Sequence, residues 1–332
     1  MTQHFAPPPR SSTWLETAQA NKGWAIAGAT VAALGASALL NHANARRAEA
    51  ATPPAGDFLE LDGVRLHYVE RGRGPAVILL HGNGVTLQDF ETSGVLDEVA
   101  KHHRVIAFDR PGFGYSSRPR STIWTPTAQA GLLAAALERL DISQAVVVGH
   151  SWGTMVALAV ALDHPRLVSG LVLLSGYYYG TARPDVYPMA LPAIPGVGDI
   201  LAHTVSPLTG ALIGPATIKA SFAPAPVSPK FARFPIGLAL RPSQVRATAA
   251  DTALMVPAAI ELSRRYRELD LPVTIMAGAG DRIAHVDKHA ERLAREIAGS
   301  RLHVIAGQGH LFHYARPDRV ADAIAEVTTR AA

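Results

Sequence analysis

From residue 57 onward, short apolar runs alternate with longer helical patterns. The apolar runs predict strands at 58–62, 64–69, 76–80, 104–108, 145–149, 170–174, 272–277 and 301–306. Helical periodicity predicts helices at 91–101, 126–140, 153–163, 286–298 and 317–329. The first two strands read as an antiparallel hairpin around Asp62 and Gly63, whereas the later runs are continuously apolar, as in strands buried on both faces. The alternation predicts an α/β fold with a mostly parallel sheet and helices on both faces.

Residues 176–262 interrupt this rhythm. They contain 12 of the 24 prolines and no strong strand pattern. Their many apolar residues indicate that the segment packs against the rest of the chain and is not a disordered linker. We therefore expect a helical insertion between two strands of the core.

An uncharged apolar segment, residues 23–40, lies between Lys22 and the pair Arg46 and Arg47. As a helix it would measure about 27 Å, close to the roughly 30 Å hydrocarbon core of a bilayer. The segment predicts a single transmembrane anchor after a tail of residues 1–22. Residues 41–56, rich in Ala, Asn and Pro, predict a linker to the domain at 57–332.

A cleaved signal segment is the main alternative to the anchor, because Ala43, Asn44 and Ala45 form a small-x-small pattern suited to a signal peptidase. A buried Ala-rich helix of the globular fold is a third interpretation. The paired arginines follow the apolar segment, whereas a twin-arginine signal precedes it. Basic residues nearly balance across the segment, so the membrane orientation is undecided, with a slight preference for an exported or periplasmic C-terminal domain.

Composition narrows the chemistry. Apolar residues make up 48% and charged residues 17%, as in folded globular proteins. The net charge of +4 comes from dispersed residues, which gives no indication of nucleic-acid binding. The absence of cysteine excludes disulfides and thiolate nucleophiles. The 14 histidines lack metal-ligand spacing such as H-E-x-x-H, so no metal or other cofactor is expected.

A nucleophile motif follows the fifth predicted strand. Residues 149–153 read Gly-His-Ser-Trp-Gly, between the apolar run 145–149 and the helical pattern 153–163. In this context G-x-S-x-G predicts a sharp strand-to-helix turn that exposes the Ser151 hydroxyl. The helix N-terminus adds free N–H groups where an oxyanion would form. The alternative is a simple Gly-Ser turn.

A serine nucleophile requires a base and an acid that orients the base. His310 follows the last predicted strand within Gly-Gln-Gly-His, and His313 is its main competitor. Asp281 follows the strand at 272–277 within a glycine turn, where an aspartate is also a common turn former. The order Ser151, Asp281, His310, with each residue after a core strand, predicts a catalytic triad.

The second oxyanion wall is expected after the third strand, at His81-Gly82-Asn83-Gly84. The backbone N–H groups of Asn83 and Trp152 are the expected donors to the oxyanion. An ordinary glycine turn is the alternative.

Five motifs in order resemble the α/β-hydrolase family: HGNG at 81–84, DRPGFGYS at 109–116, GHSWG at 149–153, GAGD at 278–281 and GQGH at 307–310. The resemblance covers residues 58–330. It implies an eight-stranded sheet, a helical cap inserted after the sixth strand, and a pocket between cap and sheet edge. Tyr177, Tyr178 and Tyr179 are candidates for a wall of that pocket.

Some motifs are also similar to haloalkane dehalogenases and epoxide hydrolases. In haloalkane dehalogenases an Asn and a Trp side chain hold the departing halide, and Asn83 and Trp152 match these two residues. Both enzyme types use a nucleophilic carboxylate, and this chain has Ser151 in its place. A serine ether has no carbonyl for water to attack, so these two activities are not expected.

The sequence thus predicts a serine hydrolase acting on an ester-like bond of a small, uncharged, moderately hydrophobic molecule. Hydrolysis of a C–C bond, amide hydrolysis and haloperoxidase-like perhydrolysis remain alternatives within the enzyme class. A noncatalytic binding module is the alternative from another class.

Overall fold

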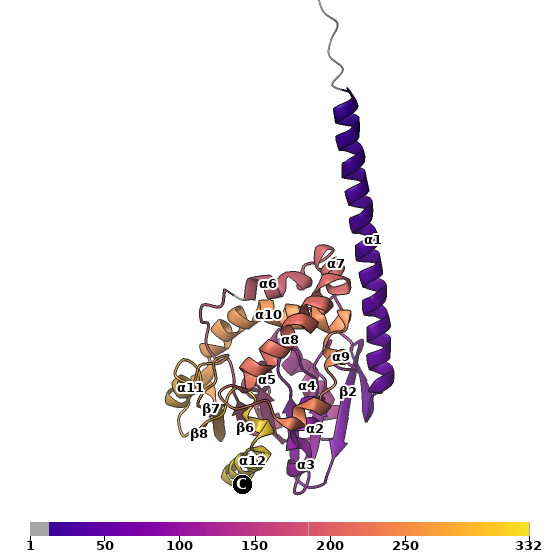
Figure 1. Ribbon diagram of the computed structural model, residues 1–332. Helices are drawn as coiled ribbons and strands as arrows, with labels where there is room; N and C mark the ends of the chain where they lie inside the picture. The colour runs from indigo at the N-terminus through magenta and orange to yellow at the C-terminus, as the bar shows by residue number, and fades with distance from the viewer. Residues whose placement is uncertain (1–12, 185, 332) are drawn as a thin grey trace, which may run out of the picture.

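The computed structural model describes residues 13–184 and 186–331. Eight strands form one sheet in the order β1-β2-β4-β3-β5-β6-β7-β8 (Figure 1). Their bounds are β1 Asp57–Leu61, β2 Val64–Arg71, β3 Ala76–Leu80, β4 Arg104–Phe108, β5 Ala145–His150, β6 Val168–Leu174, β7 Val273–Gly278 and β8 Arg301–Ile305. The eight predicted strands are confirmed, with small shifts at their ends.

The sheet is antiparallel at one edge and parallel elsewhere. β1 pairs with β2 and β2 with β4 in antiparallel register, whereas β3 to β8 run parallel. Every residue of β5 and β7 is buried, which explains why their sequences are mostly apolar. Because parallel strands end at the same edge, the loops after β3, β5, β7 and β8 lie together.

Helices cover both faces of the sheet. They are α2 Gln88–Ser93, α3 Val95–Val99, α4 Pro126–Arg139, α5 Gly153–Asp163, α11 Ala290–Glu296 and α12 Pro317–Ala331. α4 and α5 belong to one hydrophobic core, and α3 and α12 to the core on the opposite face. The helix expected at 91–101 is instead two short helices, because Gly94 adopts φ 89° between them.

The segment between β6 and β7 is helical. Its helices are α6 Val186–Ala190, α7 Val197–His203, α8 Val205–Phe222, α9 Ile236–Ala239 and α10 Pro242–Ser263. They lie together above the sheet (Figure 1). We call residues 176–262 the cap.

The N-terminal helix, α1 Thr13–Ala51, is longer than the sequence indicates. Residues 41–51, expected to be part of a linker, continue the helix. This half packs on the cap: Asn41 donates to the carbonyl of His203 at 2.9 Å, and Arg241 pairs with Glu49 at 3.0 Å. The other half extends away from the domain (Figure 1), and its apolar window is not buried, unlike a core helix. Of the predicted tail, residues 1–12 lie outside the described residues.

Candidate active site

Ser151 occupies the turn between β5 and α5. Its φ is 51°, in the left-handed region that side-chain-bearing residues rarely adopt, and its N–H donates to the carbonyl of Leu174 at 2.8 Å. Two glycines permit the tight packing around it. A Cβ on Gly149 would lie 2.6 Å from the carbonyl oxygen of Gly153, and one on Gly153 would lie 2.2 Å from that of Leu80. The G-x-S-x-G pattern is thus a steric requirement of this turn.

The structure brings Ser151, His310 and Asp281 together. His310 Nε2 lies 2.9 Å from Ser151 Oγ, and His310 Nδ1 lies 2.8 Å from Asp281 Oδ2. The carboxylate accepts a hydrogen bond from Nδ1–H, which leaves Nε2 free to accept a hydrogen bond from the serine hydroxyl. The three side chains come from loops after β5, β7 and β8, as the parallel topology requires.

Asp281 is held as a carboxylate. Its side chain is fully buried, and its Oδ1 accepts the N–H groups of Ile283 at 2.8 Å and Ala284 at 2.9 Å. Burial acts to raise its pKa, but His310 and the two backbone donors outweigh burial and lower the pKa of Asp281 below its ordinary value. The acid therefore carries its charge at neutral pH, where it can stabilise an imidazolium.

His313, the competing base, lies in a different group. Its Nε2 donates to Asp89 Oδ2 at 3.1 Å, and Tyr314 donates to Asp89 Oδ1 at 2.9 Å. His150 lies beside them and donates from Nε2 to the carbonyl oxygen of His310 at 3.3 Å. This buried group lies against the loop that carries His310, and sequence reasoning missed it. No motif marks Asp89, because its partners are distant in sequence.

The same group contains atoms suited to binding a metal. Ligand atoms of Asp89, His150 and His313 lie within 4.8 Å of one another. However, both Asp89 oxygens already accept hydrogen bonds, from His313 and from Tyr314. The arrangement is therefore that of a buried hydrogen-bond network.

The loop after β3 faces Ser151. A Cβ on Gly82 would lie 3.1 Å from Ser151 Cβ. Among the described residues, neither the Asn83 nor the Trp152 backbone N–H donates a hydrogen bond, so both remain available for an oxyanion. His81 fixes the loop by donating from Nδ1 to the carbonyl of Gly82 and accepting the Arg110 N–H at Nε2. Burial, together with Arg110, lowers the pKa of His81 to about 3, so the ring is neutral.

The Asn83 and Trp152 side chains bind the cap helix α10. Asn83 Nδ2 donates to Thr252 Oγ1 at 2.9 Å, and Trp152 Nε1 donates to the carbonyl of Asp251 at 3.0 Å. These are the N–H donors that a halide-binding pair would need. Because both donors are already bound to α10, they are not free to hold a halide. This observation and the serine at position 151 both disfavour dehalogenation.

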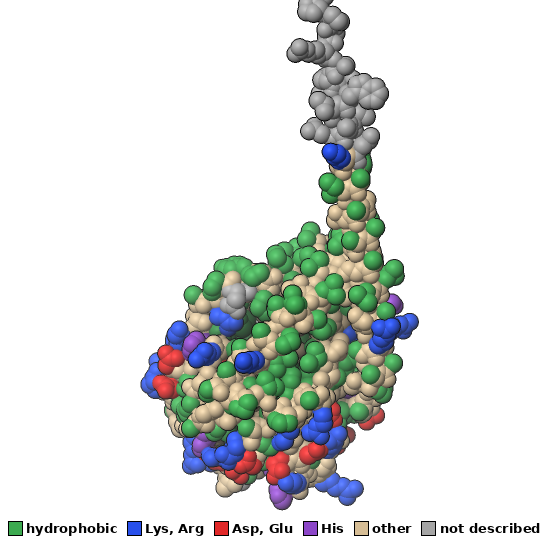
Figure 2. Space-filling view, in the orientation of Figure 1, with side chains coloured by type: hydrophobic (Ala, Val, Ile, Leu, Met, Phe, Trp, Pro, Cys, Tyr) green, Lys and Arg blue, Asp and Glu red, His purple; other side chains and the backbone are tan. Residues whose placement is uncertain are grey.

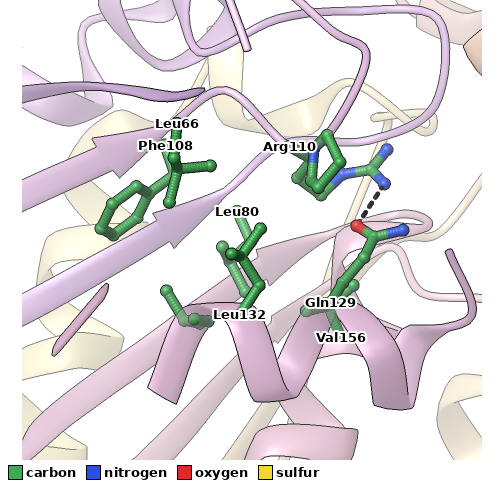
Figure 3. Close-up of a pocket in the computed structure, with 9 residues that line it drawn as sticks. Leu66, Leu80, Phe108, Arg110, Gln129, Leu132 and Val156 are labelled. Atoms are coloured by element: carbon green, nitrogen blue, oxygen red, sulfur yellow. Dashed lines mark hydrogen bonds between the residues drawn. The ribbon is translucent and has the colours of Figure 1, made fainter. Parts of the chain in front are cut away.

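A buried arginine joins the cap to the core. Arg110 donates to the carbonyls of His81 at 2.9 Å and Gly82 at 3.0 Å, and pairs with Asp251 of α10 at 2.6 Å. Figure 3 shows its further bond to Gln129 beside a small cavity of about 20 Å³, lined mainly by apolar side chains. That cavity has room for about one water molecule, so it is no substrate pocket. The motif at 109–116 indicated this region, but its pairing with the cap was not predicted.

The three tyrosines expected to line a pocket are instead buried in the core. Tyr177, Tyr178 and Tyr179 are each less than 5% exposed. Tyr179 donates to Glu296, and the Tyr177 ring packs against His289 with centroids 4.5 Å apart. Their aromatic area stabilises the start of the cap.

Comparison with known proteins agrees with this geometry. The family model described as alpha/beta hydrolase fold matches residues 75–317. The chain is 30% identical over 295 residues to an uncharacterized protein of Mycobacterium tuberculosis, covering 85% of this chain and 83% of that protein. It is 28% identical to a 2-hydroxy-6-oxo-2,4-heptadienoate hydrolase of Pseudomonas putida, over 77% of this chain and 89% of the relative.

Solved structures share the fold. An esterase from Exiguobacterium antarcticum superposes with a TM-score of 0.64 at 24% identity, and the match covers 82% of this chain and 100% of the esterase. An enol-lactonase from Burkholderia xenovorans gives a TM-score of 0.65 at 21% identity, with 82% and 100% coverage. With the family match, the sheet order and the turn at Ser151, these findings show that the chain belongs to the α/β-hydrolase family.

Proposed function

We propose that the protein is a serine hydrolase that cleaves an ester-like bond through an acyl-enzyme on Ser151. The observation that carries the proposal is the continuous hydrogen-bond chain from Ser151 Oγ through His310 to Asp281, with distances of 2.9 and 2.8 Å. A serine hydroxyl is a weak nucleophile unless a base removes its proton, and His310 Nε2 is placed to do so.

In the acylation step, Ser151 Oγ attacks the substrate carbonyl while its proton passes to His310 Nε2. The oxyanion accepts hydrogen bonds from the Asn83 and Trp152 N–H groups, each contributing roughly 10²- to 10³-fold in rate. The imidazolium then protonates the leaving alcohol. In deacylation, water attacks the acyl carbonyl while His310 takes its proton; the imidazolium then returns that proton to Ser151 Oγ as the acyl–oxygen bond breaks, which releases the acid and regenerates Ser151.

Hydrolysis of p-nitrophenyl butyrate by the full chain in detergent tests the proposal. Ser151→Ala is expected to lower kcat at least about 10³-fold. Ser263→Ala, a change of the same kind at the end of α10, is expected to leave the rate unchanged. Activity retained by Ser151→Ala would contradict the proposed nucleophile.

C–C bond hydrolysis is the second candidate, and the Pseudomonas putida relative favours it, since its name specifies a 2-hydroxy-6-oxo-dienoate substrate. The same three residues would serve a ketone carbonyl. Parallel assays with such a dienoate and with p-nitrophenyl butyrate separate the two: the substrate with the higher kcat/KM identifies the chemistry. Haloperoxidase-like perhydrolysis is distinguished by adding hydrogen peroxide to the ester assay.

We also propose that α1 is retained as a membrane anchor. The helix has an exposed apolar window within Lys22–Ala51. Cleavage after Ala45 would remove the bonds from Ser37 and Asn41 to the cap, which favours retention over removal. Fractionation of C-terminally tagged protein and its intact mass test this: loss of the first 45 residues would contradict an anchor.

A further inference from the structure

The outer face of the cap is apolar and exposed to an unusual degree. Residues 186–218 contain no Glu, Lys or Arg, and their single Asp is Asp199. Its carboxylate is paired with Arg120 at 2.7 Å and Arg246 at 3.0 Å. Exposed apolar side chains cover α6, α7 and α8, among them Tyr187, Val197, Ile200, Leu208, Leu212 and Ile213. We call these six residues the apolar cap face.

The side chains of this face are unusual for a surface in contact with water. Leu212 is 81% exposed and Tyr187 is 78% exposed. Large apolar side chains gathered in this way on one part of a surface mark an interaction site, because their exposure to water is unfavourable. α8 contributes little to the hydrophobic core: its buried residues are Pro207 and Phe222, one near each end.

Charge is distributed unequally over the molecule. Figure 2 shows hydrophobic side chains over the part of the cap next to the point where α1 leaves the domain, while most basic and acidic side chains lie toward the opposite end and at the sides. A protein that meets a bilayer on one side and water on the other has this arrangement. A uniformly wet surface would mix the two kinds of side chain.

The point at which α1 contacts the cap determines how deep the apolar cap face would lie in a bilayer that α1 spans. Ser37 Oγ donates to the carbonyl of Thr204 at 2.7 Å, and Thr204 joins α7 to α8. Fifteen residues separate Lys22 from Ser37, a rise of about 22 Å along a helix. Because a hydrocarbon core is roughly 30 Å thick, a bilayer spanned by α1 from Lys22 reaches past the level of Thr204.

We propose that the apolar cap face lies in the interface of the bilayer that α1 spans. The face and the spanning helix then bury their apolar side chains in the same medium. At the α7–α8 corner the charge of Asp199 is paired with Arg120 and Arg246, which lowers the cost of placing this corner next to hydrocarbon. This inference rests on the proposed membrane anchor and is independent of the chemistry at Ser151.

The absence of cysteine permits a direct depth measurement. Single cysteines at Leu212 (L212C), in α1 (Val31→Cys) and on the edge strand β8 (Val304→Cys) are labelled with an environment-sensitive fluorophore. The full chain is reconstituted in vesicles of phosphatidylcholine and phosphatidylglycerol, with doxyl-labelled lipid or aqueous iodide as quencher. We expect lipid quenching at positions 212 and 31, and iodide quenching at position 304.

The three positions separate the possible failures. Iodide quenching at 212 with lipid quenching at 31 would retain the anchor and overturn the cap inference. Protection at 212 from both quenchers would mean that protein covers the face, which also overturns it. Iodide quenching at both positions would remove the anchor and the inference together. Ile200→Cys on α7 tests the same face if Leu212→Cys does not fold. Circular dichroism reports the folding of each variant, so the outcome does not depend on whether p-nitrophenyl butyrate is hydrolysed.

Discussion

Arg110 Nη1 lies 2.6 Å from Asp251 Oδ2, and this buried ion pair connects the cap to the loop after β4. Arg110 also holds the His81 and Gly82 carbonyls, while the Asp251 carbonyl accepts the Trp152 indole N–H. The cap and both segments that carry the proposed oxyanion donors are therefore fixed by one pair. The Asp251 carboxylate also pairs with Arg118, at 2.9 Å.

Asp251→Asn tests this connection. Removing the carboxylate leaves two cations facing a neutral amide, one of them fully buried. Breaking a buried pair in this way costs about 3–5 kcal/mol in the free energy of unfolding. Denaturant unfolding measures the loss, and kcat is expected to fall because the oxyanion loop shifts. Asp318→Asn, which breaks the exposed pair with Arg316, is the control and should cost less than about 1 kcal/mol. Equal losses in the two variants would contradict the proposed role.

Asp281→Asn tests the proposed orienting acid. The amide can donate a hydrogen bond to His310 Nδ1 and so stabilise the wrong tautomer, in which Nε2 carries the proton. We expect kcat to fall by about 10³- to 10⁴-fold with little change in folding. Asp287→Asn, an exposed change six residues away, should leave kcat unchanged. The measurement is ester hydrolysis at pH 7, and an Asp281→Asn enzyme with normal kcat would exclude this acid.

Gly149→Ala tests why the motif requires glycine before the nucleophile. The new methyl group would lie 2.6 Å from Gly153 O and from Thr154 Cα, so backbone atoms must move. Overpacking of this kind costs about 1–3 kcal/mol, and it displaces Ser151. Gly131→Ala in α4, where a Cβ meets nothing within 4 Å, should instead stabilise the protein by about 0.5–1 kcal/mol. Thermal unfolding that shifts in the same direction for both variants would contradict the steric argument.

The sequence predicted the strands and the positions of the three triad residues after them, because both follow from local sequence patterns. Continuous apolar runs mark buried strands, and parallel topology brings the residues after them to one edge. Contacts between residues distant in sequence leave no such local pattern, and Arg110 and Asp251 are 141 positions apart. The helix at residues 41–51 was missed because contacts with the cap stabilise it. The burial of Tyr178 likewise depends on packing against residues distant in sequence.

The group formed by Asp89, His313 and Tyr314 makes a prediction about acid stability. Burial acts to raise the pKa of Asp89, but His313, His150 and Tyr314 together lower it from 3.8 to about 2. In the unfolded chain Asp89 takes up its proton near pH 4. Between pH 4 and 2 the unfolded state therefore binds more protons, and stability falls as the pH drops.

Comparison of wild type with Asp89→Asn measures this contribution. The variant is expected to be less stable at pH 7, because His313 loses its carboxylate partner, yet to lose less stability on acidification. The carboxylate contributes on the order of 2 kcal/mol above pH 4. Thermal unfolding from pH 2 to 7 gives both quantities, and Asp57→Asn, an exposed change on β1, should retain the wild-type slope. If Asp89→Asn kept the full wild-type decline in Tm below pH 4, the acid sensitivity would lie elsewhere, and the network around Asp89 would not be its source.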